Sequence, residues 1–250
     1  MDARLRIGLF AVSAVALVLL LVWGTSGLPA FGHYAGPYGD LISRLAKPQR
    51  KIANAVTATV FDYRGFDTLG EELILVAAAC ATAMLLRDVR EANVEGIIDP
   101  VHSDAVSGVG AVVAIATFVL ALQVIAHGYL TPGGGFQGGV LLSAAFALVF
   151  LTVEYRAFYT LTTVKLTEPL EGFGAAAFVA LGLLALALGL AFLQNVLPHG
   201  TFGRLTSSGS VALLNWSSGI AVGGAFLVLY GEYLQEAMVV RHRRGESGGS

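Results

Sequence analysis

The chain has 250 residues, of which 56% are hydrophobic and 13% are charged, and its formal net charge is -2. Soluble domains carry about 25% charged residues, so this composition indicates a membrane protein, and the near-neutral charge argues against a nucleic-acid partner. The single cysteine, Cys80, excludes a disulfide framework and a thiolate metal cluster.

Apolar runs of about 20 residues, the length that crosses about 30 Å of hydrocarbon, predict the membrane-spanning helices. Six segments qualify along the chain: residues 7–23, 61–86, 105–126, 136–153, 173–193 and 211–230. We therefore predict an all-α integral membrane protein with about six transmembrane helices and short loops. A cleaved signal peptide is the alternative for the first segment.

The distribution of Lys and Arg predicts the orientation in the membrane. Nine of these 15 residues fall on the side of the N-terminus and six on the other side, which places both termini in the cytoplasm. The basic segment 44–51 lies on the outer side. We interpret it as an interfacial amphipathic helix that contacts partner subunits.

The second segment reaches spanning length only by including charged residues. The apolar run 73–86 is too short to span alone, so it is either re-entrant or part of a long helix that includes residues 61–72. We favour the long helix, because residues 53–60 are also apolar enough to continue it.

Four charged residues of this segment are ion-path candidates, because ionisable groups within spans mark function by default. Arg64, Asp67 and Glu71 share one helix face, and Glu72 follows directly. A basic residue beside two carboxylates can keep one of them ionised while the other titrates. The alternative is an interfacial helix cap with ordinary salt bridges.

A glycine-rich turn, residues 127–139, connects the third and fourth predicted helices. Thr131 can cap a helix that begins at Pro132, and the glycines permit close backbone approach. A phosphate-binding loop is excluded, because no Lys-Ser/Thr pair follows and no strand precedes. The residues assigned a structural role in this turn are Thr131, Pro132, Gly133, Gly134, Gly135 and Gln137. His127 is a candidate proton relay, with a structural hydrogen-bonding role as the alternative.

Residues 197–204 lie on the same side of the predicted membrane as the glycine turn. There His199 and Arg204 are candidates for lining an entry vestibule, with a solvated loop as the alternative. The histidines lack metal-ligand spacing, and the sequence contains neither a nucleophile motif nor a cofactor fingerprint. We therefore expect no metal, no cofactor and no independent enzyme activity.

Two stretches resemble known families. Residues 126–139, together with 197–203 and 213–215, resemble the MnhB subunit of Mrp-type (Mnh-type) Na+/H+ antiporters, over about residues 105–234. Residues 54–72, with 28–32, resemble the C-terminal part of the MrpA subunit and the equivalent small E-type subunit of membrane-bound hydrogenases. The resemblance divides the chain into a two-helix unit (1–90), a cytoplasmic linker (91–104), a four-helix MnhB-like domain (105–240) and a disordered tail (241–250).

The resemblance implies a non-catalytic subunit of a multisubunit Na+/H+ antiporter in a prokaryotic cell membrane. Its implied partners are large proton-translocating subunits and small membrane subunits, and the implied transported ions are Na+ and H+. A component of a membrane-bound hydrogenase or other complex I-related redox complex is one alternative, and a purely structural adaptor is another.

The resemblance also implies roles for single residues. Asp67 and Glu71 match the membrane-embedded acidic residues of the family, and His127 matches the histidine of its glycine turn. Tyr129 stands where many members have a second histidine. The last helix has Asn215 and Ala221 where members often have a carboxylate, which shifts the expected ion-carrying role to the second span.

Overall fold

The computed structural model describes residues 3–28, 32, 36–86, 103–153, 155–162 and 164–247. It forms two compact units, residues 1–41 and residues 42–250. The predicted linker at 91–104 lies, up to residue 102, outside the described residues. Among the described residues, six helices are long and apolar enough to cross a membrane, which confirms the predicted all-α membrane fold.

The first unit contains the spanning helix α1 (Ala3–Ser26), whose apolar stretch runs from Ile7 to Ser26. The hydroxyl of Thr25 donates to the carbonyl of Leu21, and the hydroxyl of Ser26 donates to the carbonyl of Trp23. The second bond occupies a carbonyl in the last turn of the helix, where backbone acceptors lack intrahelical partners.

Short helical turns then lead to the second spanning helix: α2 (Pro37–Leu45), η1 (Ala46–Arg50), α3 (Ala55–Ala58) and η2 (Thr59–Tyr63). Their buried residues, including Ile52, Ala58 and Phe61, join a hydrophobic cluster with Phe178 and Leu214. From Ile42 onward, these turns therefore pack onto the bundle of the second unit and are not a free loop.

The second spanning helix, α4 (Gly65–Leu85), contains Asp67, Glu71 and Glu72, as expected. The prediction of one long helix from residue 61 onward is wrong, however. The backbone leaves the helical conformation at Arg64, with φ −133° and ψ 36°. The hydroxyl of Thr68 donates to the carbonyl of Val60, eight residues earlier, and this bond holds η2 against the first turn of α4.

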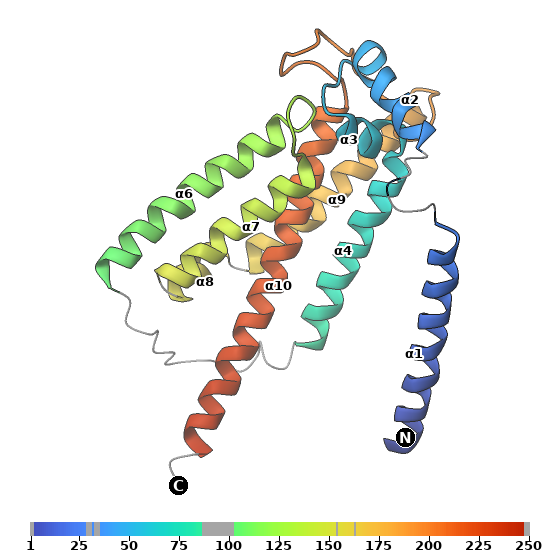
Figure 1. Cartoon of the computed structure of the whole chain (residues 1–250). Helices are drawn as coiled ribbons and strands as arrows, with labels where there is room; N and C mark the ends of the chain where they lie inside the picture. The colour runs from blue at the N-terminus through green and yellow to red at the C-terminus, as the bar shows by residue number, and fades with distance from the viewer. Residues whose placement is uncertain are drawn as a thin grey trace. The chain divides into compact units, whose positions relative to one another are not determined.

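The remaining helices form a bundle with α10 (Val211–Ser247) at its centre, as Figure 1 shows. They are α6 (Asp104–Ala126), α7 (Gly135–Thr152), the short α8 (Tyr155–Leu161) and α9 (Val164–Ala187). The central helix is in contact with α4, α6, α7 and α9, and it buries 72% of its most apolar stretch, against at most 33% for the other spanning helices. Glycines of α7 and α9 permit this close packing, because small residues let helix backbones approach each other.

The glycine-rich turn connects α6 and α7, as predicted, but Thr131 does not cap a helix that begins at Pro132. The helix α7 begins at Gly135. Gly133 and Gly134 have φ values of +131° and +149°, conformations that only glycine adopts readily, so the chain cannot be helical before residue 135. The hydroxyl of Thr131 donates instead to the carbonyl of His127 at 3.3 Å.

The fifth span differs from its prediction at both ends, since its spanning stretch is Pro169–Ala187 and not residues 173–193. A glycine in the left-handed region, Gly189 (φ +75°), ends α9. The N–H of Leu190 donates to Ala185 and that of Gly189 to Leu186, which is a Schellman motif. At the other end of the chain, α10 continues to Ser247, through part of the tail predicted to be disordered.

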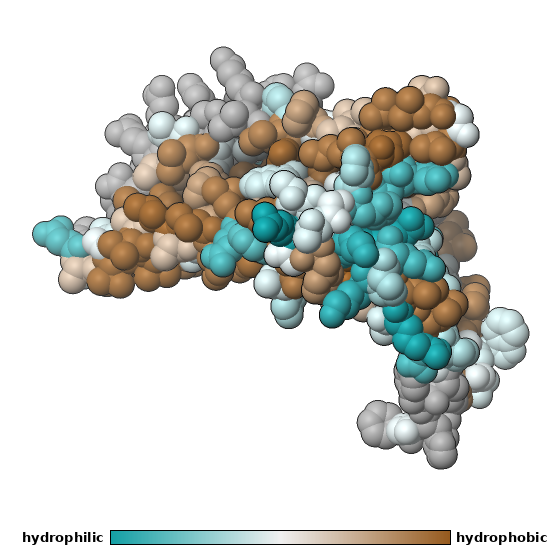
Figure 2. All heavy atoms as spheres, turned by 90° about the horizontal axis from the view of Figure 1, so that it is seen from above, coloured by the Kyte–Doolittle hydropathy of each residue, from teal (hydrophilic) through white to brown (hydrophobic). Residues whose placement is uncertain are grey.

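The glycine turn, the short helical turns and the segment between α9 and α10 all lie at one end of the second unit (Figure 1). Direct bonds connect them: the hydroxyl of Tyr129 donates to the carbonyl of Leu205, and the hydroxyl of Ser208 donates to the carbonyl of Lys51 at 3.2 Å. Figure 2 looks onto this end and shows a patch of hydrophilic residues bordered by hydrophobic ones. This arrangement confirms that residues 197–204 share a side with the glycine turn.

Candidate functional site

Asn54, which precedes α3, holds the glycine turn. Its amide nitrogen lies 2.8, 3.0 and 3.2 Å from the carbonyl oxygens of Gly128, Thr131 and Gly133. Its side-chain oxygen accepts hydrogen bonds from the first turn of α3 and so caps that helix. The Asn54 side chain therefore connects the glycine turn to the start of α3, which lies about 75 residues earlier in the chain.

Two further side chains complete this support. The hydroxyl of Thr57, on α3, donates to the carbonyl of Gly128 at 2.7 Å. The side-chain oxygen of Asn215, on α10, accepts from the N–H of Gly135 at 2.9 Å, and its amide donates to the carbonyl of Val211. Both Thr57 and Asn215 are buried, so the backbone of the turn finds its partners inside the protein, as a membrane protein requires.

Glu72, on α4, points into the bundle and is 1% exposed. Its Oε1 accepts a hydrogen bond from the hydroxyl of Ser218 on α10, and its Oε2 has no hydrogen-bond partner among the described residues. Ser218 is also fully buried, and it lies against Gly135, where an added Cβ would come within 2.6 Å of the Ser218 Cβ. The carboxyl group of Glu72 therefore lies close to the contact of α4, α7 and α10, inside a membrane-spanning segment.

A pocket of about 240 Å³ lies one helical turn above this carboxyl group. It opens between α3, η2, the start of α4 and the glycine turn, and combines apolar walls with side-chain oxygens. Its lining residues are Val56, Thr57, Val60, Phe61, Thr68, Glu71, Gly133, Gly134, Phe136 and Gln137. Thr68 lies four residues before Glu72, so both occupy one face of α4.

The charged candidates of the second span are thus separated by their surroundings. Glu71 lines the pocket and is exposed, whereas Glu72 is buried against α10. Arg64 and Asp67 form an ion pair with each other, and their side chains are 57% and 47% exposed. The four residues therefore do not form one cluster. Glu71 lies in the pocket lining, and the ion pair Arg64–Asp67 lies outside it.

The three remaining candidates lie at the same end of the unit but outside the pocket lining. The backbone N–H of His127 donates to the carbonyl of Gln123, and its Nδ1 lies 3.1 Å from the same oxygen, so His127 completes the end of α6. Arg204 is exposed in a turn. His199 is half-buried, with Nε2 enclosed and without a hydrogen-bond partner among the described residues.

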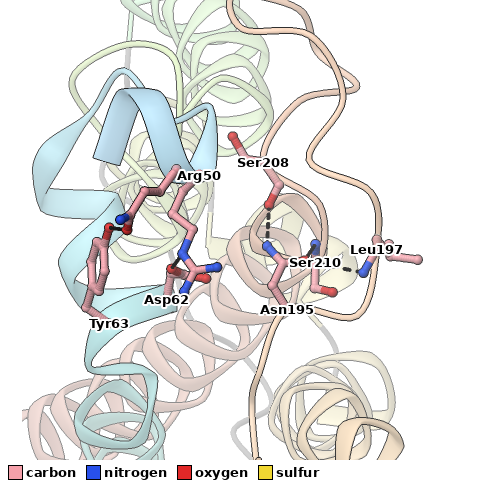
Figure 3. Close-up of polar contacts among 8 residues, drawn as sticks. Arg50, Asp62, Tyr63, Asn195, Leu197, Ser208 and Ser210 are labelled. Atoms are coloured by element: carbon pink, nitrogen blue, oxygen red, sulfur yellow. Dashed lines mark hydrogen bonds and ion pairs between the residues drawn. The ribbon is translucent and has the colours of Figure 1, made fainter. Parts of the chain in front are cut away.

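A second polar site lies beside His199. Arg50 Nε is 2.6 Å from Asp62 Oδ2, and the Asp62 side chain is 3% exposed. Figure 3 shows this pair facing Asn195, whose side chain bonds Ser208 and Ser210 of the loop before α10. Burial raises the pKa of Asp62, against the opposing effects of the Arg50 and His199 charges and of the Asn195 hydrogen bond.

Sequence reasoning missed several buried polar residues. Glu171 on α9 and Glu232 on α10 are each 4% exposed and lie within spanning stretches. An apolar-run criterion ends each predicted span at the first charge, so both residues fell just outside the predicted segments. Ser218 gave no signal. Asp62 lies in the charged segment 61–72, but its partner Arg50, like the partner of Ser218, can be recognised only after the chain has folded.

The chain is similar in sequence to a known domain family and to proteins of other organisms. Residues 105–228 match the family described as a domain related to the MnhB subunit of Na+/H+ antiporter. An uncharacterized protein of Methanocaldococcus jannaschii is 28% identical over 82% of this chain and 85% of its own length. A protein of Rhizobium meliloti described as a probable A/B-type subunit of a K+/H+ antiporter is 33% identical, but over only 40% of this chain and 12% of its own length.

Two solved structures share the fold. One is a chain of the membrane-bound sulfane sulfur reductase, an archaeal respiratory membrane complex, with a TM-score of 0.68 and 29% identity over 92% of this chain and 98% of that one. The other belongs to the Mrp complex from Dietzia sp., with a TM-score of 0.66 and 21% identity over 93% of this chain and 26% of that one. The chain is thus a multi-pass membrane protein, and its residues 105–228 match the model of the domain family related to the MnhB subunit.

Proposed function

We propose that this chain is a non-catalytic membrane subunit of a multisubunit cation/proton antiporter, and that Glu72 is a proton-carrying group in its ion path. The observation that carries the proposal is the buried Glu72 carboxyl group, hydrogen-bonded to Ser218 and lying one helical turn below a pocket lined by oxygens. The MnhB-related domain and the shared fold with a chain of the Mrp complex support the assignment to an antiporter-type complex.

A carboxyl group within a membrane span is costly and is retained mainly where it has a function. Glu72 meets this criterion, since it is buried at a contact of spanning helices and has one oxygen that is not engaged among the described residues. Ser218 can donate a hydrogen bond to the carboxylate or accept one from the protonated acid. The pair can therefore hold Glu72 in both protonation states, which a group that takes up and releases protons requires.

The proposed partners are the large proton-translocating subunits and the small membrane subunits of such a complex, in a prokaryotic plasma membrane with both termini in the cytoplasm. Na+ and H+ are the proposed transported ions. In this arrangement the chain contributes a segment of the ion path and does not transport ions alone.

Cation-dependent collapse of a pH gradient, measured in everted membrane vesicles containing the complete complex, tests this role. Glu72→Gln keeps the shape of the side chain but cannot carry a proton, so we expect it to reduce exchange at least tenfold while the complex still assembles on native gels. Asp67→Asn is the matched control, because Asp67 is exposed and paired with Arg64, and it should retain exchange. Full exchange by Glu72→Gln in an assembled complex would rule out Glu72 as a proton-carrying group.

A specific observation favours a second candidate function, membership of a redox-driven membrane complex. This chain matches a complete chain of the sulfane sulfur reductase complex, 98% of its length, but only 26% of the matching Mrp chain. Purification of the native complex through a tag on this chain separates the two functions. Co-purifying subunits with redox centres would favour the redox complex, and their absence from an intact, exchange-competent complex would favour the antiporter.

A further inference from the structure

We infer that the pocket between α3, the start of α4 and the glycine turn binds a monovalent alkali cation, with Glu71 as its charged ligand. The inference rests on the proposed function and specifies where the transported cation is held. The proton-carrying role proposed for Glu72 and the cation-binding role inferred for Glu71 would then belong to consecutive residues that face different environments.

The lining of the pocket has the chemistry of a cation site. Alkali cations in membrane proteins are coordinated by oxygens, commonly from side chains and from unwound backbone near helix ends. Here the lining residues include Glu71, Gln137, Thr57 and Thr68, whose side chains carry a carboxyl group, an amide oxygen and two hydroxyls. Both hydroxyl protons are directed to backbone carbonyls, those of Gly128 and Val60, so the hydroxyl oxygens present lone pairs.

Three of the oxygens near this pocket converge on one point. A Cβ added to Gly134 would lie 3.2 Å from Asn215 Oδ1, 3.2 Å from Gln137 Oε1 and 3.7 Å from Thr57 Oγ1. These side chains come from three separate segments, α10, α7 and α3, and glycine leaves the space between them open. Glycine at position 134 therefore leaves a small space between these three oxygens, and the side chain of any other residue would fill it.

The size of the pocket fits a cation that retains part of its hydration. Water occupies about 30 Å³ per molecule, so about 240 Å³ accommodates an ion with several waters. A single carboxylate supplies one negative charge, which matches one monovalent cation. Among the described residues, no group of three His, Cys, Asp or Glu side chains forms a site of the kind that holds a multivalent metal.

Hydrogen–deuterium exchange of the purified, complete complex tests the site locally. Peptides covering residues 54–72 and 127–139 are compared in LiCl, NaCl, KCl and choline chloride at equal ionic strength. We expect at least one alkali cation to slow exchange in both peptides in a saturable manner, with choline inactive. Glu71→Gln should raise the half-saturating concentration at least tenfold.

Two variants separate this inference from the proposed function. Asp67→Asn, one turn away and outside the pocket, should leave the cation response unchanged, and Glu72→Gln should also preserve it while abolishing transport. If Glu72→Gln transports normally but Glu71→Gln loses the cation response, the proposed role of Glu72 fails and the site stands. An unchanged cation response in Glu71→Gln, or protection by choline equal to that by the alkali cations, would overturn the site.

Discussion

The side-chain oxygen of Asn215, in the first turns of α10, accepts the backbone N–H of Gly135, the first residue of α7, at 2.9 Å. Helix N-termini leave several N–H groups without intrahelical partners, and in lipid no water is available to satisfy them. Asn215 is fully buried and therefore serves as an inter-helix cap for α7. This bond also fixes the position of the glycine turn, and hence of the pocket, relative to the central helix.

Removal of this cap should destabilise the protein. We expect Asn215→Ala to cost about 1–3 kcal/mol, because the N–H of Gly135 loses its buried partner. Thermal unfolding of the detergent-solubilised full chain measures the effect. The matched control is Ser217→Ala, whose hydroxyl donates to the carbonyl of Leu213 within α10. It should cost less stability than Asn215→Ala, because a helix carbonyl that loses this bond keeps its backbone partner, whereas the N–H of Gly135 loses its acceptor. Equal losses in both variants would show that the cap contributes nothing specific.

Close packing of α7 on α10 depends on glycine at position 135. An added Cβ there would lie 2.5 Å from the carbonyl oxygen of Asn215 and 2.6 Å from the Cβ of Ser218. Gly135→Ala should therefore force the two helices apart and cost about 1–3 kcal/mol, the usual cost of overpacking. Gly108→Ala on α6, where an added Cβ meets nothing within 4 Å, should be neutral or slightly stabilising. The same thermal assay compares them, and a neutral Gly135→Ala would contradict the observed helix contact.

Much of the fold follows from apolar run length alone, which is why the six spans were predictable. The errors lie where a single hydrogen bond or a glycine decides a helix end. The expected long helix is broken by the backbone at Arg64, where the bond from Thr68 to Val60 spans the break, and Gly189 ends α9 before residue 193. Neither effect has a periodic signature in the sequence.

The candidate site was predictable only in part, for the same physical reason. Charges inside a predicted span pointed to α4, and both Glu71 and Glu72 lie there. Which of the two is buried depends on the rotation of α4 against α10, and this is set by packing such as that of Ala79 on Ala225. Long-range partners such as Ser218 become identifiable only when the two helices are in contact.

The buried Asp62 should make stability depend on pH. Burial raises its pKa above the ordinary value of 3.8, so the folded protein holds a proton that the unfolded chain has already released. This contribution to stability is fully present below pH 3.8 and is lost as pH rises through the folded-state pKa. We therefore expect Asp62→Asn, which is neutral at every pH, to unfold with a flatter pH dependence over this range than the unmodified chain.

Thermal unfolding at a series of pH values from about 3.5 upward tests this expectation. The Arg50 side chain is 34% exposed, so it retains access to water when its partner is neutralised, and Asp62→Asn should fold. Asp104→Asn, which removes an exposed acid in the first turn of α6, is the control and should keep the original slope. A parallel slope for Asp62→Asn would mean that Asp62 has the same pKa in the folded and unfolded chain.

The orientation of the bundle in the membrane is testable with two single cysteines. Thr201 lies in the exposed loop between α9 and α10, at the end of the bundle that holds the glycine turn, and Ser103 caps the opposite end of α6. The excess of Lys and Arg on the side of the N-terminus predicts that the glycine-turn end faces outward. In a Cys80→Ala background, a membrane-impermeant maleimide added to intact cells should label Thr201→Cys. Ser103→Cys should react only after permeabilisation. The reverse pattern would place the pocket on the cytoplasmic side, and the inferred cation would then enter from the cytoplasm.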